Sequence, residues 1–153
     1  AKTEKAKSYL PKLSVKPFQD DITTFASKVD DMVWMESYTR IDLGLDVAYN
    51  EMFQTDNGMR LDENCHKAVI VMTDGENDED APLSELDPAK KFHDDGIKVI
   101  VIGIGSDASI NEQELLTLVK SPRYFHRAQD FGVLLTDSFM KTVVDCEKLA
   151  GKQ

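Results

Sequence analysis

The sequence predicts an α/β fold: a doubly wound, mostly parallel sheet with helices on both faces. Two runs, KAVIVMT at 67–73 and IKVIVIGIG at 97–105, are apolar without alternation. Such runs are typical of strands that are covered on both faces, as in parallel sheets. Segments with helical spacing lie before, between and after these runs, and that order favours right-handed crossovers between parallel strands.

Length and charge limit the classes of function. The 153 residues suit one domain, 1–153, whose core needs no metal or disulfide to fold. The net charge of −10 and the pI of about 4.7 disfavour nucleic acid and anionic membranes, which attract basic patches. No apolar run approaches the roughly 20 residues of a membrane span, so we expect no membrane insertion. Residues 1–10 lack the apolar core of a signal peptide, so we expect no targeting segment there.

The first half of the chain predicts an edge strand followed by two helices. KLSVKPF at 12–18 alternates apolar and polar residues, and its proline confines it to a sheet edge. Apolar residues at helical spacing predict one helix within 20–35 and another over 40–53. Residues 54–64 are rich in turn formers and predict a loop.

The second half alternates strands with helices. The predicted elements are a strand at 67–73, a helix within 84–96, a strand at 97–105, a helix at 111–121, a strand at 123–128 and a helix at 130–150. Gly96 is expected to close the first of these helices. Ser109 or Asp107 is expected to cap the second, with Glu112 three residues after Ser109 forming a capping box.

Concentrated negative charge follows one of the strands. VIVMTDGENDED at 69–80 runs from apolar residues into Asp74 and further carboxylates. Ligands of open α/β sheets bind at the carboxyl ends of the strands, so Asp74 is expected on the ligand-bearing edge. The alternating carboxylates resemble a calcium loop of the EF-hand kind, but Glu79 stands where that loop needs glycine. We favour a solvated acidic rim that influences which partners bind through their charge.

The order and spacing of several blocks resemble a von Willebrand factor A domain, most of all those of collagens, matrilins and integrins. The blocks are DDMVWMESYTRIDLGLDVAYNEMF at 30–53, HKAVIVMTDGENDED at 66–80, AKKFHDDGIKVIVIGIG at 89–105 and LLTLVKSPRYFHRAQDFGVLL at 115–135. The resemblance covers the chain from about Leu13 to Glu147.

The resemblance implies a metal-ion-dependent adhesion site built from three loops. Thr39 matches the family's second loop, and Asp74 in the TDG sequence matches the third. Oxygen donors of this kind suit Mg²⁺ or Ca²⁺, and a carboxylate of the partner protein would complete the coordination shell. Tyr38, Glu76 and Asp78 would form a rim for the partner. The first loop, Asp-x-Ser-x-Ser, does not occur in the sequence, so the sequence matches two of the three loops that hold the metal in this family.

The resemblance also implies a central first strand and a first helix that this sequence does not contain. That strand would pair with the run at 68–72, whose backbone groups would otherwise lack partners. Three arrangements would supply it: another part of a longer polypeptide, residues directly before Ala1, or another chain, as in a dimer completed by strand exchange.

The two cysteines, Cys65 and Cys146, are predicted at the edge opposite the metal, because a helix that follows a parallel strand runs back to the edge where strands begin. A disulfide between them would contribute roughly 4 kcal/mol by closing a long loop and would indicate an oxidising, extracellular setting. The alternatives are two buried thiols, or one cysteine that pairs with a segment outside this sequence.

These observations predict an extracellular adhesion or matrix-binding domain rather than an enzyme. The expected partners are matrix proteins such as collagen. The sequence has no nucleophile elbow and no phosphate-binding glycine loop, and no histidine is close in sequence to Asp74. The alternative is a metal-independent structural module that assembles with other chains. A metal-dependent hydrolase has only Asp74 in its favour.

Overall fold

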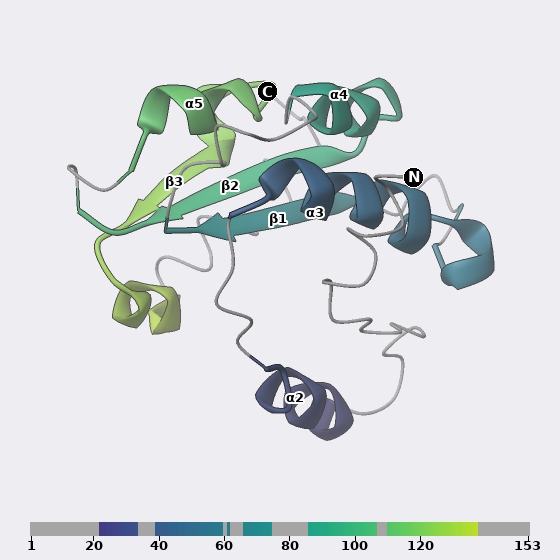
Figure 1. Cartoon of the computed structure of the whole chain (residues 1–153), viewed down its shortest axis with the longest axis horizontal. Helices are drawn as coiled ribbons and strands as arrows, with labels where there is room; N and C mark the ends of the chain where they lie inside the picture. The colour runs from purple at the N-terminus through teal and green to yellow at the C-terminus, as the bar shows by residue number, and fades with distance from the viewer. Residues whose placement is uncertain are drawn as a thin grey trace.

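A computed structural model describes residues 22–33, 39–59, 61, 66–74, 86–106 and 110–137 (Figure 1). The strands are β1 (Ala68–Thr73), β2 (Lys98–Ile104) and β3 (Phe125–Ala128). The α-helices are α2 (Ile22–Asp30), α3 (Ile41–Val47), α4 (Leu86–Asp94) and α5 (Glu112–Thr117). A π-helical segment η1 (Ala48–Met52) extends α3, and 3₁₀ turns form η2 (Thr55–Asn57), η3 (Pro122–Tyr124) and η4 (Phe131–Leu135).

The three strands form a parallel sheet in the order β1-β2-β3, which confirms the predicted fold class. β1 pairs with β2 from Ala68 beside Lys98 to Thr73 beside Gly103. The central strand β2 is buried from Val99 to Ile104. Its unbroken apolar sequence therefore reflects cover on both faces, as the absence of alternation predicts.

The helices α4 and α5 lie next to each other on one face of the sheet (Figure 1). Gly103 of β2 allows α5 to approach, because a Cβ atom there would lie 3.3 Å from Ile110 and 3.4 Å from Leu115. Side chains alternate along a strand, so Val99 and Val101 face the same helices as Gly103. Ile100 and Ile102 face the opposite side, together with Ile70 and Met72 of β1 in the paired register.

The helix α4 ends at the glycine that the sequence predicts. Gly96 has φ of 71°, in the left-handed region that glycine adopts at low cost. The Gly96 amide donates to the His93 carbonyl in the last turn of the helix. The Ile97 amide donates to the Phe92 carbonyl over 2.8 Å. This double closure is a Schellman motif, and it delivers the chain directly into β2.

The cap of α5 differs from the prediction. Asn111, and neither Ser109 nor Asp107, is the N-cap residue, and its side-chain oxygen accepts from the Glu114 amide over 3.3 Å. The Asn111 side-chain amide donates back to the Glu114 carboxylate over 3.2 Å. The helix begins later than expected because Ile110 is buried against Gly103, which places the first helical turn after it.

The last predicted helix begins differently as well. Asp130 caps a 3₁₀ turn, η4, by accepting from the amides of Gly132 and Val133. Thr136 then has an extended backbone (φ −85°, ψ 129°), so no continuous helix starts at Asp130. The remainder of that helix and the predicted strand at 12–18 lie outside the described residues.

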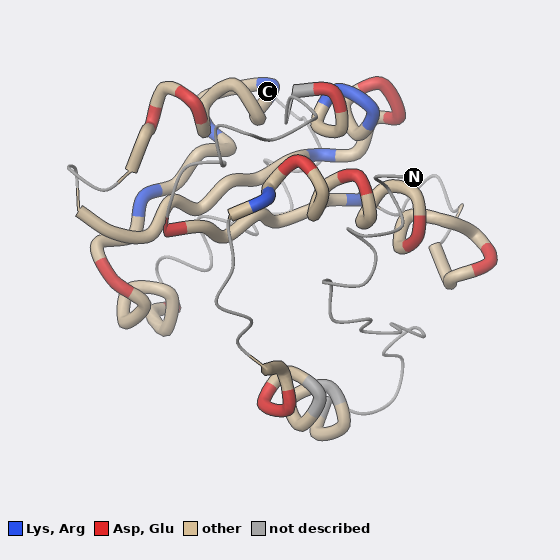
Figure 2. Tube along the Cα trace, viewed as in Figure 1, with Lys and Arg blue, Asp and Glu red and all other residues tan. Residues whose placement is uncertain are grey.

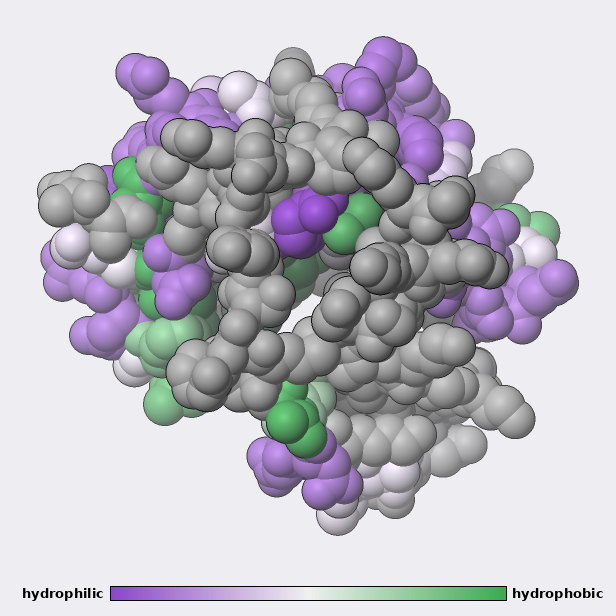
Figure 3. All heavy atoms as spheres, in the orientation of Figure 1, coloured by the Kyte–Doolittle hydropathy of each residue, from purple (hydrophilic) through white to green (hydrophobic). Residues whose placement is uncertain are grey.

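Acidic residues are spread over all four α-helices rather than gathered in one of them (Figure 2). Figure 3 shows hydrophilic residues over much of the described surface and hydrophobic spheres near α2 and η4. The exposed side chains there are Val29, Met32, Val33, Phe131 and Leu135. Within the described segments, no helix is long and apolar enough to span a bilayer.

His93 of α4 makes the fold sensitive to acid. Burial is the main cause that lowers the pKa of this imidazole below its usual 6.5, and nearby Lys120 lowers it further, against weaker opposing effects of Asp94 and a hydrogen bond to the Leu118 backbone. The unfolded chain therefore takes up a proton near pH 6.5 that the folded chain resists. Stability due to neutral His93 is present above pH 6.5 and is lost as the pH falls from there through the folded-state pKa.

We expect His93→Gln to flatten the decline in unfolding free energy between pH 7.5 and pH 5, measured by urea denaturation. His66→Gln, at an exposed histidine, is the matched control and should retain the wild-type dependence. An H93Q protein that loses stability as steeply as the wild type would show that His93 is not the acid-sensitive group.

Candidate functional site

The candidate site lies at the carboxyl edge of the sheet. Asp74 follows the last residue of β1 directly and is exposed, while Thr73 before it is buried. The chain therefore turns from core to solvent within one residue, which leaves the Asp74 carboxylate at the surface. This is the position that the strand run and the TDG sequence predict.

Thr39 reaches the same edge by way of α3. Asp46 bonds to Lys91, and further along the chain Tyr49 bonds to Asp95. Residue numbers therefore rise in the same direction along α3 with its extension η1 and along α4, so the two helices run parallel. Because α4 crosses back from the end of β1 to the start of β2, α3 also runs from the carboxyl edge toward the opposite edge. Thr39 is half-buried and stands two residues before α3, so it lies at the carboxyl edge, where Asp74 also lies.

A partly buried ion pair adjoins Thr39. The Asp42 carboxylate is fully buried and accepts from Arg40 at both oxygens, from Nε over 2.8 Å and from Nη2 over 2.7 Å. The Arg40 side chain is 27% exposed, so the guanidinium reaches the surface while its partner does not. This two-point contact holds the first turn of α3 and neutralises the Asp42 charge beside Thr39.

The pair at Arg40 and Asp42 was not foreseen from the sequence. Asp42 falls between apolar positions of the predicted helix, and acidic residues in a first turn are common at helix starts because of the dipole. The only signal for burial is the neighbouring arginine, which could equally serve a surface contact. The burial itself follows from how Ile41 and Leu45 seat α3 in the core.

The donors at Thr39 and Asp74 fit a hard cation. A hydroxyl and a carboxylate are oxygen ligands of the kind that Mg²⁺ and Ca²⁺ prefer. The Asp74 carboxylate is exposed, so a cation could reach it from solvent. Among the residues that the structure describes, no three His, Cys, Asp or Glu side chains gather as a metal site. Two protein donors alone leave most of a coordination shell to water or to a partner.

Five other predicted site residues lie outside the described part of the chain. They are the rim residues Tyr38, Glu76 and Asp78 and the cysteines Cys65 and Cys146. The disulfide and the rim therefore stay predictions.

The fold is an α/β domain whose parallel sheet exposes Asp74 at its carboxyl edge, and comparison with known proteins gives its family. The sequence model of the von Willebrand factor type A domain matches residues 7–141. The chain therefore belongs to the von Willebrand factor type A domain family, as its motifs predict.

Relatives by sequence share part of the chain. Von Willebrand factor A domain-containing protein 2 of Xenopus laevis is 42% identical over 76 residues, which is 50% of this chain and 8% of the relative. The collagen alpha-6(VI) chain of Mus musculus is 34% identical over 85 residues, 56% of this chain and 4% of the relative. The chain thus spans less than a tenth of the length of these relatives.

Solved structures agree with the fold. Proximal thread matrix protein 1 of the mussel byssus superposes with a TM-score of 0.68 at 28% identity, over 83% of this chain and 30% of that one. A second structure of that protein, described as having a zinc-occupied MIDAS motif, gives a TM-score of 0.68 at 29% identity over the same shares.

The ion pair beside Thr39 can be tested directly. Arg40→Met leaves the buried Asp42 carboxylate without its bidentate partner, and we expect a loss of about 2–3 kcal/mol in unfolding free energy, somewhat below the cost for a wholly buried pair. The double variant Arg40→Met/Asp42→Leu should recover most of this loss, because no buried charge remains. Urea denaturation of the four proteins of this cycle measures both effects. A loss below about 0.5 kcal/mol for R40M would mark the pair as an ordinary surface contact.

Proposed function

We propose that the chain is an extracellular matrix-binding module that holds a divalent cation at its carboxyl edge and binds a protein partner there. The observation that carries this is the convergence of Thr39 and Asp74 at one edge, from two elements 35 positions apart in the sequence. Family membership and the matrix proteins among the relatives support a binding role rather than catalysis.

The cation is Mg²⁺ or Ca²⁺ in this proposal. Thr39 and Asp74 offer hard oxygen donors, and Mg²⁺ in particular keeps several water ligands when a protein supplies few. A bound cation presents an open coordination position to a carboxylate of the partner. The zinc in the related mussel protein supports a metal at this edge and leaves the choice of ion to experiment.

Partner contacts would extend beyond the cation. We place Tyr38, Glu76 and Asp78 at the rim, where an aromatic ring and carboxylates would contact a matrix protein such as collagen. With a net charge of −10, the chain would attract a partner that carries basic residues around the carboxylate it donates. Such attraction weakens as the salt concentration rises.

Asp74 provides the decisive test of the cation. Asp74→Asn keeps the size of the side chain and removes its charge, so we expect the dissociation constant for Mn²⁺ to rise at least about tenfold, the lower range for residues that support a metal. Titration calorimetry measures this affinity, and retention on immobilised collagen with Mg²⁺ or with EDTA measures partner binding. Asp137→Asn, at another exposed aspartate, is the control. Equal Mn²⁺ affinity in D74N and wild type, or collagen retention that survives EDTA unchanged, contradicts the proposal.

A second candidate function is metal-independent assembly, and the exposure of β1 favours it. On the sheet face opposite α4 and α5, Ile100 and Ile102 of β2 are 1% and 2% exposed. Their neighbours in the register, Ile70 and Met72 of β1, are 40% and 60% exposed. The apolar cover of this face thus thins toward β1, although β1 has the sequence of a strand covered on both faces. A strand and helix from another chain would complete it.

If the chain assembles through the exposed face of β1, a charged substitution on that face should dissociate the assembly. Met72→Lys places a charge where an apolar partner would pack, and we expect it to shift a sedimenting assembly toward the 17.2 kDa monomer. Met52→Lys, at an exposed methionine of η1, should leave the assembly intact. A wild-type chain that sediments as a stable, folded monomer rules out assembly through strand exchange between copies.

A further inference from the structure

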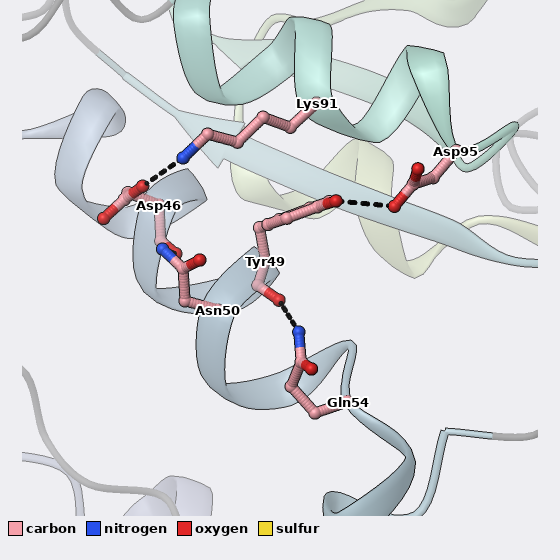
Figure 4. A network of polar contacts seen from close by, with 6 residues as sticks. All are labelled: Asp46, Tyr49, Asn50, Gln54, Lys91 and Asp95. Atoms are coloured by element: carbon pink, nitrogen blue, oxygen red, sulfur yellow. Dashed lines mark hydrogen bonds and ion pairs between the residues drawn. The ribbon is translucent and has the colours of Figure 1, made fainter.

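The far end of α3 is fastened to α4 by a set of contacts that we call the clamp (Figure 4). The clamp consists of Asp46, Tyr49 and Phe53 on the α3–η1 side and Lys91, Phe92 and Asp95 on the α4 side. The Lys91 ammonium lies 2.9 Å from the Asp46 carboxylate. The Tyr49 hydroxyl donates to the Asp95 carboxylate over 2.6 Å.

Ring contacts lie beneath these polar bonds. Phe92 is fully buried, and Tyr49 and Phe53 both meet it edge to face, with centroids 5.2 Å and 5.1 Å away. Lys91 also lies 5.6 Å from the centre of the Tyr49 ring. Each pair ties α3 or η1 to α4, so the clamp resists both rotation and sliding of one helix along the other.

The π-helical segment makes this double ring contact possible. In a regular α-helix, residues four apart drift by about 40° around the axis, so Tyr49 and Phe53 would progressively leave the face of Ile41 and Leu45. The Phe53 amide instead donates to the Ala48 carbonyl over 3.0 Å, an i to i+5 bond that widens the turn and reduces the drift. Side-chain amides of Asn50 and Gln54 donate to the Asp46 and Tyr49 carbonyls, each over 2.9 Å.

The energies of the polar bonds point to a role other than stability. The Lys91 and Asp46 side chains are 45% and 22% exposed, and exposed ion pairs of this kind contribute about 0.2–1 kcal/mol. The polar bonds have a larger effect on the orientation of α3 than on stability. Thr39 lies ten residues before Tyr49, or about 15 Å along a helix. A tilt of only about 5° at the clamp would displace Thr39 by about 1.3 Å, and metal–ligand distances tolerate only about 0.2 Å.

We propose that the clamp is a positioning device for the carboxyl-edge cation site: it sets the orientation of α3 and through it the place of the Thr39 hydroxyl. Asp46, Tyr49 and Lys91 touch neither cation nor partner and act through the helix. This inference rests on the proposed cation site, and its test separates the two.

The test uses variants that remove one polar contact and keep the packing. Tyr49→Phe deletes only the hydroxyl, and Lys91→Met deletes the charge and keeps an unbranched stem. Lys90→Met is the matched control, because Lys90 bonds Asp94 within α4 at 2.5 Å and is 71% exposed. Three readouts are taken: Mn²⁺ affinity by calorimetry, amide hydrogen exchange over Thr39–Leu45, and unfolding by urea.

We expect Y49F and K91M to raise the Mn²⁺ dissociation constant about three- to tenfold, less than the loss of a residue that directly supports a ligand. Amide exchange over Thr39–Leu45 should accelerate in the same variants. K90M should match the wild type in both. Unchanged Mn²⁺ affinity and unchanged exchange in Y49F and K91M would overturn the proposal and reduce the clamp to helix packing.

Failure of the cation site gives a different result. If the wild type binds no Mn²⁺, the proposed function fails. Amide hydrogen exchange then becomes the only test of whether the clamp sets the orientation of α3. Faster exchange over Thr39–Leu45 in Y49F and K91M, absent in K90M, would then support control of α3 by the clamp. Exchange equal to that of the wild type would overturn it.

Discussion

The parallel pairing of β1 with β2 is the constraint on which the rest of the structure depends. Parallel neighbours cannot be joined by a tight turn, so the chain crosses back through α4 before it enters β2. That crossing places the end of every strand at one edge and the ends of the returning helices at the other. Asp74 at the end of β1 and Thr39 before α3 share an edge for this reason, although 35 positions separate them.

Two aspartates, Asp42 in the first turn of α3 and Asp74 after β1, differ in burial. Asp42 is fully buried, and Arg40 neutralises it through two short hydrogen bonds. A buried carboxylate without such a partner would cost several kcal/mol, roughly as much as a small domain can lose. Asp74 has the opposite environment, exposed to solvent beside a buried threonine. The two aspartates therefore differ in role because of burial, one fixing the helix start and the other facing outward.

The strands and the placement of Asp74 could be predicted from the sequence because they follow from local pattern. The run at 67–73 became β1 at Ala68–Thr73, and the run at 97–105 became β2 at Lys98–Ile104. The cap of α5 could not be predicted in this way. Ser109 and Asn111 are both good cap residues, and the packing of Ile110 on Gly103 decided between them.

In the candidate site, too, some features follow from local sequence pattern and others depend on packing. Asp74 could be placed from its strand alone, while the Arg40–Asp42 pair and the clamp depend on how α3 is rotated against the core and against α4. The apolar spacing of 40–53 predicts a helix but does not distinguish an α turn from a π turn. A widened turn changes which residues face Phe92 without changing the apolar pattern. Contacts between helices are therefore the part that sequence periodicity leaves open.

The two candidate functions meet at one place on the molecule. Met72 is 60% exposed and lies one residue before the last residue of β1, so it stands close along the chain to Asp74, which follows that strand. A segment that covered Ile70 and Met72 would thus extend toward the carboxyl edge at Asp74. Burial of that margin would lower the local dielectric and strengthen the attraction of Asp74 for a cation, while bringing new donors within reach. If both proposals hold, completion of the sheet and binding of a cation at its edge would be coupled rather than exclusive, because both would act on the end of β1.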